Sequence, residues 1–278
     1  MRGLISSALC FTAIGLATAP AFAEQPVLER QWLTDGFTNP EGVATAPDGS
    51  YFISNVAGWA AEADGEGWIS VMSADGALLT EKWAEGLDAP KGMVVQDGIL
   101  YVADITTVRR YDSKTGEALP SLPAPGAKFL NDMTVWHGHV LVSDSQGASI
   151  YTLTDEGFKI WAQDEERLGG INGLLGDGDR LLVSTMSTGS LLEVDKDKNW
   201  TEIASGMVDA DGIGIVPGGY LVSAWRGEIY FVSNEGDVTS LLNTREEGIK
   251  QNDLSVFGDL IIVPNWDPST VSGWKIGK

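Results

Sequence analysis

The sequence predicts an all-β protein, a six-bladed β-propeller with four-stranded blades. One segment, consisting of an apolar strand, a turn and a second apolar strand, recurs six times along the chain. Successive copies are offset by 50, 40, 41, 39 and 41 residues. A strand-rich repeat near forty residues is typical of propeller blades. The residues that open the copies are polar or charged: Glu41, Lys91, Asn131, Asn172, Asp211 and Asn252.

The two strands of each copy are joined by a short turn rich in Asp and Gly. Asp48-Gly49 and Asp97-Gly98 are examples, and glycine readily adopts the positive φ angles that tight hairpins need. The second strands are aliphatic and β-branched, which is typical of buried strands. The copies span residues 39–55, 89–104, 129–144, 170–185, 209–224 and 251–265.

A third strand and a more polar fourth strand follow in most copies, and the polar fourth strand fits an exposed outer edge. The last copy has too little chain after it for a fourth strand. We expect residues 28–36, which precede the first copy, to supply that strand and so join the two ends of the ring. The third strands are predicted at 68–73, 108–113, 149–154, 190–195 and 228–233.

Residues 1–23 read as a secretory signal peptide, and residues 24–278 as one propeller domain. Arg2 precedes an apolar core, and Ala21-Phe22-Ala23 forms the expected cleavage site. A membrane anchor is disfavoured because the apolar run is short and interrupted by Pro20. The sequence therefore predicts a secreted, periplasmic protein without membrane insertion. Cleavage would also remove Cys10, the single cysteine, and with it any thiolate chemistry.

The chain is strongly acidic, with a formal net charge of −21 at pH 7. Such a charge repels nucleic acid and anionic lipid, so neither is expected as a partner. It favours cations instead.

One side chain from the same place in each blade forms a ring at one mouth of the central channel. This ring offers carboxylate and amide oxygens, which are the ligands preferred by calcium, with magnesium or manganese as alternatives. Asp132 and Asp253 follow ring residues and add two further carboxylates. The other interpretation is that Asn and Asp at strand starts bond only to local backbone.

Lys91 is the one cation of the ring, and an ammonium lowers the affinity of a site for metal ions. It is interpreted either as an ion-pair partner of Glu41 or Asp132, or as a contact for an anionic substrate group.

The chain resembles the SMP-30/gluconolactonase/LRE-like family of six-bladed propellers. The resemblance covers the whole mature chain and is carried by PEG (40–42), LND (130–132), ING (171–173) and ADG (210–212). It implies a catalytic divalent metal in the channel, usually calcium, with manganese, magnesium or zinc as alternatives. The implied metal ligands are Glu41, Asn131, Asn172 and Asp211. The Asn131-Asp132 pair matches a family position at the substrate or the metal.

The reaction implied by the resemblance is hydrolysis of a lactone or related ester, with a small molecule as the partner. Asp211 is the first candidate for the catalytic carboxylate, as ligand or base, and Asp253 is the second, from its position. Substrate contacts are expected from Lys91, Asn131 and Asp132. Three tryptophans in loops on the ring side are expected to form an apolar wall, or else to pack between blades: Trp59, Trp225 and Trp266.

The only histidines, His137 and His139, flank a hairpin glycine at the end of the blade that faces away from the ring. A serine–histidine hydrolase therefore has little support. A non-catalytic propeller remains the alternative function. It would hold a ligand or a protein partner at the same mouth, with the ion as a structural element.

Overall fold

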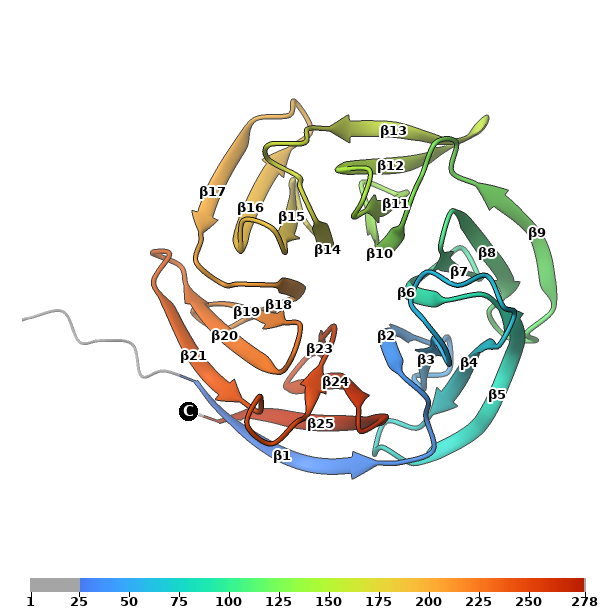
Figure 1. The fold of residues 1–278 in the computed structure, drawn as a ribbon, viewed down its shortest axis with the longest axis horizontal. Coiled ribbons are helices and arrows are strands. Elements are labelled where there is room, and N and C mark those ends of the chain that lie inside the picture. The colour runs from blue at the N-terminus through green and yellow to red at the C-terminus, as the bar shows by residue number, and fades with distance from the viewer. Residues whose placement is uncertain (1–25, 278) are drawn as a thin grey trace, which may run out of the picture.

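The computed structural model describes residues 26–277, which form 25 β-strands arranged in six blades around a central channel (Figure 1). The prediction of a six-bladed β-propeller with four-stranded blades is confirmed. The predicted signal peptide, residues 1–23, lies outside the described residues. Within residues 26–277 no helix has the length and apolar character needed to cross a membrane.

The first five blades each consist of four consecutive antiparallel strands, with the first strand innermost. Blade 1 contains β2 (Pro40–Thr45), β3 (Tyr51–Asn55), β4 (Gly67–Met72) and β5 (Leu78–Leu87). Blade 2 contains β6 (Pro90–Gln96), β7 (Ile99–Asp104), β8 (Thr107–Asp112) and β9 (Ala118–Pro123). Blade 3 contains β10 (Leu130–Trp136), β11 (His139–Asp144), β12 (Ser149–Thr154) and β13 (Gly157–Gln163). Blade 4 contains β14 (Ile171–Asp177), β15 (Arg180–Thr185), β16 (Ser190–Asp195) and β17 (Trp200–Ala204). Blade 5 contains β18 (Ala210–Val216), β19 (Gly219–Ala224), β20 (Glu228–Ser233) and β21 (Val238–Asn243).

The sixth blade is built from both ends of the described chain. Its inner strand is divided into β22 (Lys250–Gln251) and β23 (Ser255–Phe257), which both pair with β24 (Leu260–Asp267). The remaining strands are β25 (Thr270–Gly277) and, at the outer edge, β1 (Val27–Thr34). β1 pairs antiparallel with β25, so the predicted closure by an N-terminal strand is confirmed.

The hydrophobic core lies between neighbouring blades. Between blades 1 and 2, for example, Phe52 and Leu87 pack in one cluster with Met93 and Leu100, and all four are buried. Each blade thus buries its apolar side chains against the next blade. This packing holds the six inner strands in a closed ring around the channel.

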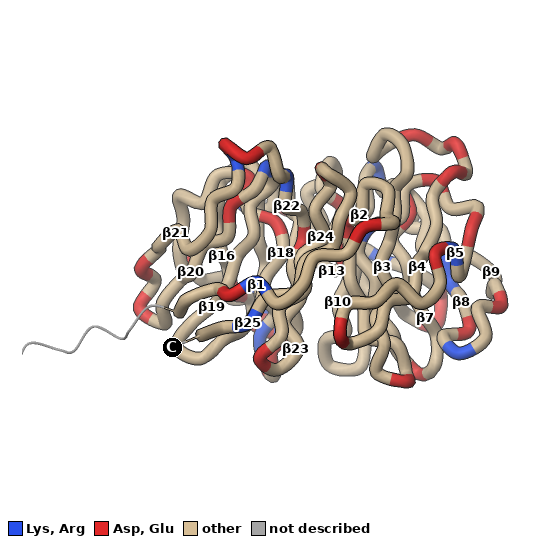
Figure 2. The backbone as a smooth tube through the Cα atoms, turned by 90° about the horizontal axis from the view of Figure 1, so that it is seen from below, with Lys and Arg blue, Asp and Glu red and all other residues tan. Residues whose placement is uncertain are grey.

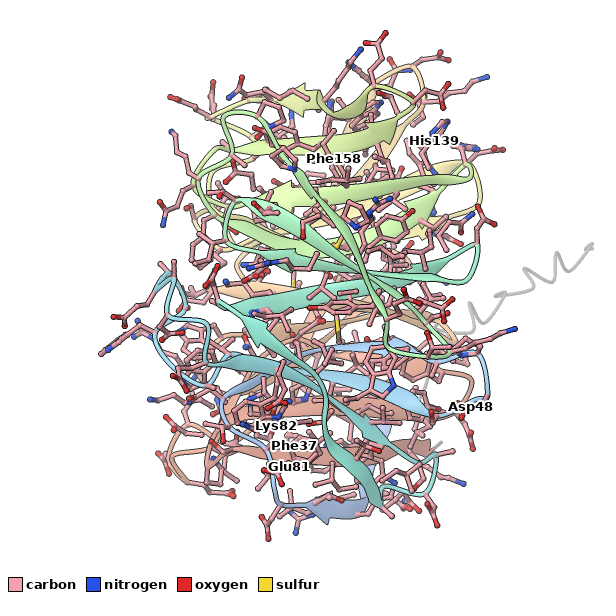
Figure 3. All side chains as sticks on the ribbon, turned by 90° about the vertical axis from the view of Figure 1, so that its right-hand side faces the viewer. Phe37, Asp48, Glu81, Lys82, His139 and Phe158 are labelled. Atoms are coloured by element: carbon pink, nitrogen blue, oxygen red, sulfur yellow. The ribbon has the colours of Figure 1, made fainter. Side chains whose placement is uncertain are left out.

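The two faces of the disc are distinct. The hairpins that join inner strands to second strands lie on one face, where Figure 3 shows Asp48 of blade 1 and His139 of blade 3 on the same side. The ring positions lie toward the other face. Asp and Glu occupy loops on both faces, with few Lys and Arg among them (Figure 2).

Candidate functional site

The six ring side chains are all buried at the start of the inner strands. Their exposed fractions lie between 2% and 6%. Five belong to the innermost strands β2, β6, β10, β14 and β18, and Asn252 lies between β22 and β23. The set comprises Glu41, Lys91, Asn131, Asn172, Asp211 and Asn252.

A β-bulge at the ring position aims these side chains in the first five blades. In blade 3, Leu130 pairs with Asp144 and Met133 pairs with Val142, so that Asn131 and Asp132 together oppose the single residue Ser143. The same shift occurs in β2, β6, β14 and β18. Bulges of this kind redirect side chains near functional sites.

A buried serine in the second strand satisfies the backbone of the bulge. The Oγ of Ser143 accepts the N–H of Asp132 at 2.9 Å and donates to the carbonyl of Asn172 in the next blade at 2.7 Å. Ser54, Ser184 and Ser223 likewise accept a backbone N–H in their own blades. These serines support the ring and were missed by sequence reasoning, although a serine is the last residue but one in four of the six second strands and could have indicated them.

Glu41 and Asp211 form the acidic part of the ring. Burial and then the charge of Asp211 raise the pKa of Glu41 well above its ordinary value, while Lys91 lowers it. Burial, followed by Asp132 and Asp209, raises the pKa of Asp211 to about 8. Within residues 26–277 neither carboxylate accepts a hydrogen bond. Two buried carboxylates that are near each other and lack donors favour a cation.

The amides of the ring present oxygen rather than nitrogen. Asn131 donates its Nδ2 to Ser145 Oγ at 3.1 Å, and its buried Oδ1 has no hydrogen-bond partner. Asn172 directs its Nδ2 to the sulfur of Met186 at 3.5 Å. An unpaired buried carbonyl oxygen is costly, and a hard cation would satisfy it.

The donor set therefore fits a divalent cation bound by oxygen. In the described part of the chain, no three His, Cys, Asp or Glu side chains come together as a metal site. An ion at the ring would thus rely on amide oxygens beside Glu41 and Asp211. Such mixed oxygen sets suit calcium.

Lys91 is turned away from a direct ion pair. Its Nζ donates to the carbonyl of Ala89 at 2.9 Å and lies 4.4 Å from the ring centroid of Phe129. No carboxylate of residues 26–277 lies within 4.0 Å of this nitrogen. Burial lowers the pKa of Lys91 to about 8, and Glu41 and Asp104 oppose that effect. The ammonium thus acts on the ring through its charge and not through contact.

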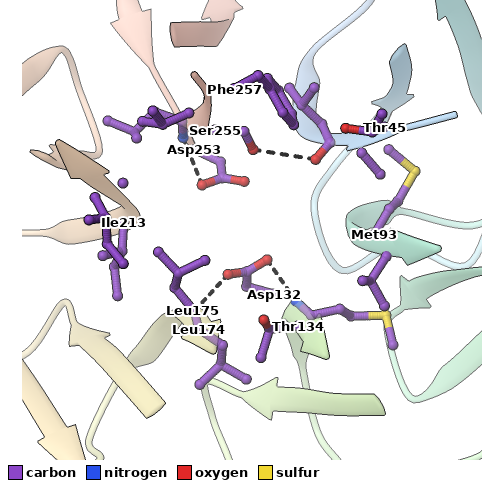
Figure 4. A pocket seen from close by; sticks show the side chains of 18 of the residues that line it. Thr45, Met93, Asp132, Thr134, Leu174, Leu175, Ile213, Asp253, Ser255 and Phe257 are labelled. Atoms are coloured by element: carbon purple, nitrogen blue, oxygen red, sulfur yellow. Dashed lines mark hydrogen bonds between the residues drawn. The ribbon is translucent and has the colours of Figure 1, made fainter. Parts of the chain in front are cut away.

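Asp132 and Asp253 open to a different space, a cavity of about 460 Å³ on the hairpin side of the ring (Figure 4). Glu41 and Asp211 do not line this cavity. Burial raises the pKa of Asp132 to about 7 and that of Asp253 well above its ordinary value. Asp132 and Asp253 thus line the cavity, whereas Glu41 and Asp211 form the ring pair, and the charges of the two pairs still act on one another.

The predicted tryptophans do not form a single wall. Trp225 and Trp266 are half-buried and meet edge to face with ring centroids 5.6 Å apart, after β19 and within the end of β24. Trp59 is 80% exposed. His137 and His139 are exposed at the β10–β11 hairpin, on the face that the sequence predicted.

Neither a family model nor a curated protein matches the sequence. Among solved structures, virginiamycin B lyase from Staphylococcus aureus matches with a TM-score of 0.65 and 14% identity, over 90% of this chain and 99% of that chain. A catalytically inactive variant of that lyase with quinupristin matches at 0.63, also with 14% identity and the same coverage. A streptogramin B lyase structure matches at 0.55, with 13% identity over 91% of this chain and 98% of that one. At these identities the matches show a shared six-bladed propeller fold.

Proposed function

We propose that this protein is an exported, divalent-metal-dependent hydrolase that opens a lactone or a related ester at the ring of the central channel. One observation carries the proposal. Glu41 and Asp211 are buried near each other without hydrogen-bond donors, beside an Asn131 oxygen that also lacks a partner. The sequence resemblance to the SMP-30/gluconolactonase/LRE-like family supports the reaction class.

Glu41, Asn131, Asn172 and Asp211 would hold the ion, preferably calcium. When bound, such an ion supplies charge that polarises a carbonyl and makes water more acidic. In the reaction, water adds to the carbonyl carbon of the lactone. The bond from that carbon to the ester oxygen of the lactone breaks, and this oxygen takes up a proton to give a hydroxy acid.

The protein's own residues orient the substrate and handle the protons. Asp211 is the candidate to hold the ion or to take the proton of the attacking water. Asp253, the second sequence candidate, lines the cavity on the hairpin side, and this placement favours Asp211. The Trp225–Trp266 pair lies at the ends of two second strands and would give the substrate an apolar contact.

Histidine chemistry has no support at this site. The inactive lyase variant has a histidine replaced by alanine. Here both histidines are exposed on the hairpin face, away from the ring. A carboxylate is therefore the better candidate for base.

A hydrolysis assay with the purified protein tests the proposal. A panel of lactones and aryl esters is offered to chelated protein and to protein with calcium, manganese, magnesium or zinc. Activity should require metal, and Asp211→Asn and Asn172→Ala should each lower it more than about tenfold. Asp237→Asn and Asn234→Ala change the same residue types at exposed turn positions and should leave it unchanged. Activity that survives chelation and both ring substitutions would refute the site.

One observation favours the second candidate, a binding propeller with a structural ion. The ring side chains are at most 6% exposed, and a structural ion needs no access from solvent. In that case calcium would raise the melting temperature of the wild type but not of Asp211→Asn, and no compound of the panel would be hydrolysed.

Export is tested separately. Fractionation of cells that express the full chain should place the protein in the periplasm, and mass spectrometry of the intact protein should show Glu24 as its first residue.

A further inference from the structure

Most of the side chains that line the cavity on the hairpin side of the ring are apolar. It is enclosed by the inner strands of all six blades, and its volume is about 460 Å³ (Figure 4). Two of its three hydroxyl groups are engaged: Thr134 Oγ1 accepts the N–H of Gly176 at 3.0 Å, and Ser255 Oγ donates to the carbonyl of Val43 at 3.4 Å. The third, that of Thr45, has no hydrogen bond within residues 26–277. The apolar walls include Val43, Met93, Leu174, Ile213, Leu254 and Phe257.

Two carboxylates from opposite blades face each other in this cavity. Figure 4 shows Asp132 of blade 3 and Asp253 of blade 6 directed toward one another. Asp132 accepts the backbone N–H groups of Met133 at 2.7 Å and Leu174 at 2.6 Å, which fixes its orientation. Asp253 is 8% exposed; its Oδ1 accepts the N–H of Leu254 at 2.7 Å, and its Oδ2 has no hydrogen bond within residues 26–277.

The backbone of the preceding blades makes room for both carboxylates. A Cβ on Gly92 would lie 2.6 Å from Asp132 Oδ1, and a Cβ on Gly212 would overlap Asp253 Oδ1. No Lys, Arg or His lines the cavity, and neither carboxylate has an ion pair in the described part of the chain. An apolar cavity thus contains two acidic groups without a countercharge, and burying uncompensated charge is unfavourable.

We propose that this cavity binds an organic amine of single positive charge that carries an apolar group. The ammonium donates to Asp253 Oδ2 and to Asp132, and the apolar group lies against the wall side chains. Burial of that group adds about 25 cal/mol for each Å² removed from water. This second site lies next to the ring but is lined by other residues, and it does not rest on the hydrolase proposal.

A divalent metal fits this cavity less well. Calcium is usually bound by roughly six to eight oxygen ligands. Both Asp132 oxygens already accept backbone N–H groups, and most of the other lining side chains are apolar. An ammonium group needs only a few hydrogen-bond acceptors, and the apolar part of an organic amine can pack against apolar side chains.

Calorimetry of the chelated protein with n-hexylamine tests the proposal. 1-Hexanol has the same chain without the charge, and methylamine has the charge without the chain. Hexylamine should bind at least about tenfold more tightly than either, because both the charge and the apolar group contribute. Equal binding of hexylamine and hexanol, equal binding of hexylamine and methylamine, or no binding of hexylamine would each overturn the proposal.

Two kinds of variant locate the site. Asp253→Asn should weaken hexylamine binding at least about tenfold, whereas the exposed control Asp237→Asn should not change it.

Ile215 also lines the cavity and is 39% exposed, so its substitution should leave the fold intact. Ile215→Lys should weaken binding roughly threefold or more relative to Ile215→Gln, because the added charge repels the amine. Equal affinity of the two Ile215 variants would place the amine elsewhere, even if Asp253→Asn does not fold.

Asp211→Asn separates this proposal from the hydrolase. It should weaken hexylamine by no more than about threefold, because Asp211 does not line the cavity and acts on Asp132 and Asp253 only through its charge. A loss of amine binding in this variant would place the amine at the ring and overturn the second site.

Discussion

The carboxylate of Asp253 occupies the space that a side chain on Gly212 would need. Three blades earlier in the chain, the carboxylate of Asp132 likewise approaches the position that a side chain on Gly92 would occupy. The residues after the ring positions repeat accordingly: Gly42, Gly92 and Asp132 in the first three blades, and Gly173, Gly212 and Asp253 in the last three. The channel therefore has an approximate twofold pattern in which each aspartate is next to a glycine of the preceding blade.

Gly212→Ala tests this relation. The added Cβ would overlap Asp253 Oδ1 and the backbone of Leu254, so the free energy of unfolding should fall by about 1–3 kcal/mol. Urea denaturation measures the change. Gly277→Ala is the control, since its nearest neighbour would be 3.6 Å away and its stability should stay within about 0.5 kcal/mol of wild type. Equal effects at both glycines would show that the Gly212–Asp253 approach is not tight.

Ser143→Ala removes a hydroxyl that links two blades. Its Oγ accepts from Asp132 N–H and donates to the Asn172 carbonyl, and both groups would be left buried without it. We expect a loss of about 1–3 kcal/mol in the free energy of unfolding. Ser240→Ala, at an exposed position where the structure gives the side chain no hydrogen bond, should change it by less than about 0.5 kcal/mol. Similar losses for the two serines would contradict the role of the link.

Lys91→Met keeps most of the side-chain volume and removes the charge near Glu41. Without the ammonium the ring should bind calcium roughly tenfold more tightly, because the repulsion between two cations is gone. Calcium titration by calorimetry measures the affinity. Lys128→Met is the matched control, since this lysine is exposed and its Nζ has one hydrogen bond within residues 26–277, to the Gln146 carbonyl at 3.4 Å. Unchanged or weaker calcium binding by Lys91→Met would argue against an ion at the ring.

The stability of the chelated protein should fall as the pH rises from about 5 to about 7.5. Burial raises the pKa of Asp132 to about 7 and that of Asp211 to about 8 in the folded state, well above the ordinary value for an aspartate. In this window the folded protein binds more protons than the unfolded chain, so raising the pH favours unfolding. Each such group contributes at most about 1.4 kcal/mol per pH unit.

Urea denaturation of wild type and Asp211→Asn at several pH values measures this slope. The variant should show a shallower fall, because its amide does not titrate, and calcium should flatten the slope of the wild type by favouring ionised ligands. A wild-type stability that rises with pH over this range would contradict the raised pKa values.

The propeller could be predicted because its signals are local and repeated. Each copy carries the same strand, turn and strand, and the shortage of chain after the last copy indicated that residues 28–36 close the ring. The common place of Glu41, Asn131, Asn172 and Asp211 followed from the same register.

The division of the carboxylates could not be predicted. Alternation along a strand assigns side chains to faces, but in the bulge Asn131 and Asp132 both oppose Ser143, so simple alternation fails there. The orientation of Lys91 depends on Phe129 and the Ala89 carbonyl, contacts that no spacing in the sequence reveals.

The pairing of β1 with β25 has a consequence for how the molecule folds. This contact joins segments separated by nearly the whole described chain, and such long-range pairing slows folding. Local hairpins can form early, whereas the sixth blade and the closed ring of blades are complete only when β1 pairs with β25. During refolding, the far-UV circular dichroism signal of β-structure should therefore recover before ligand binding does.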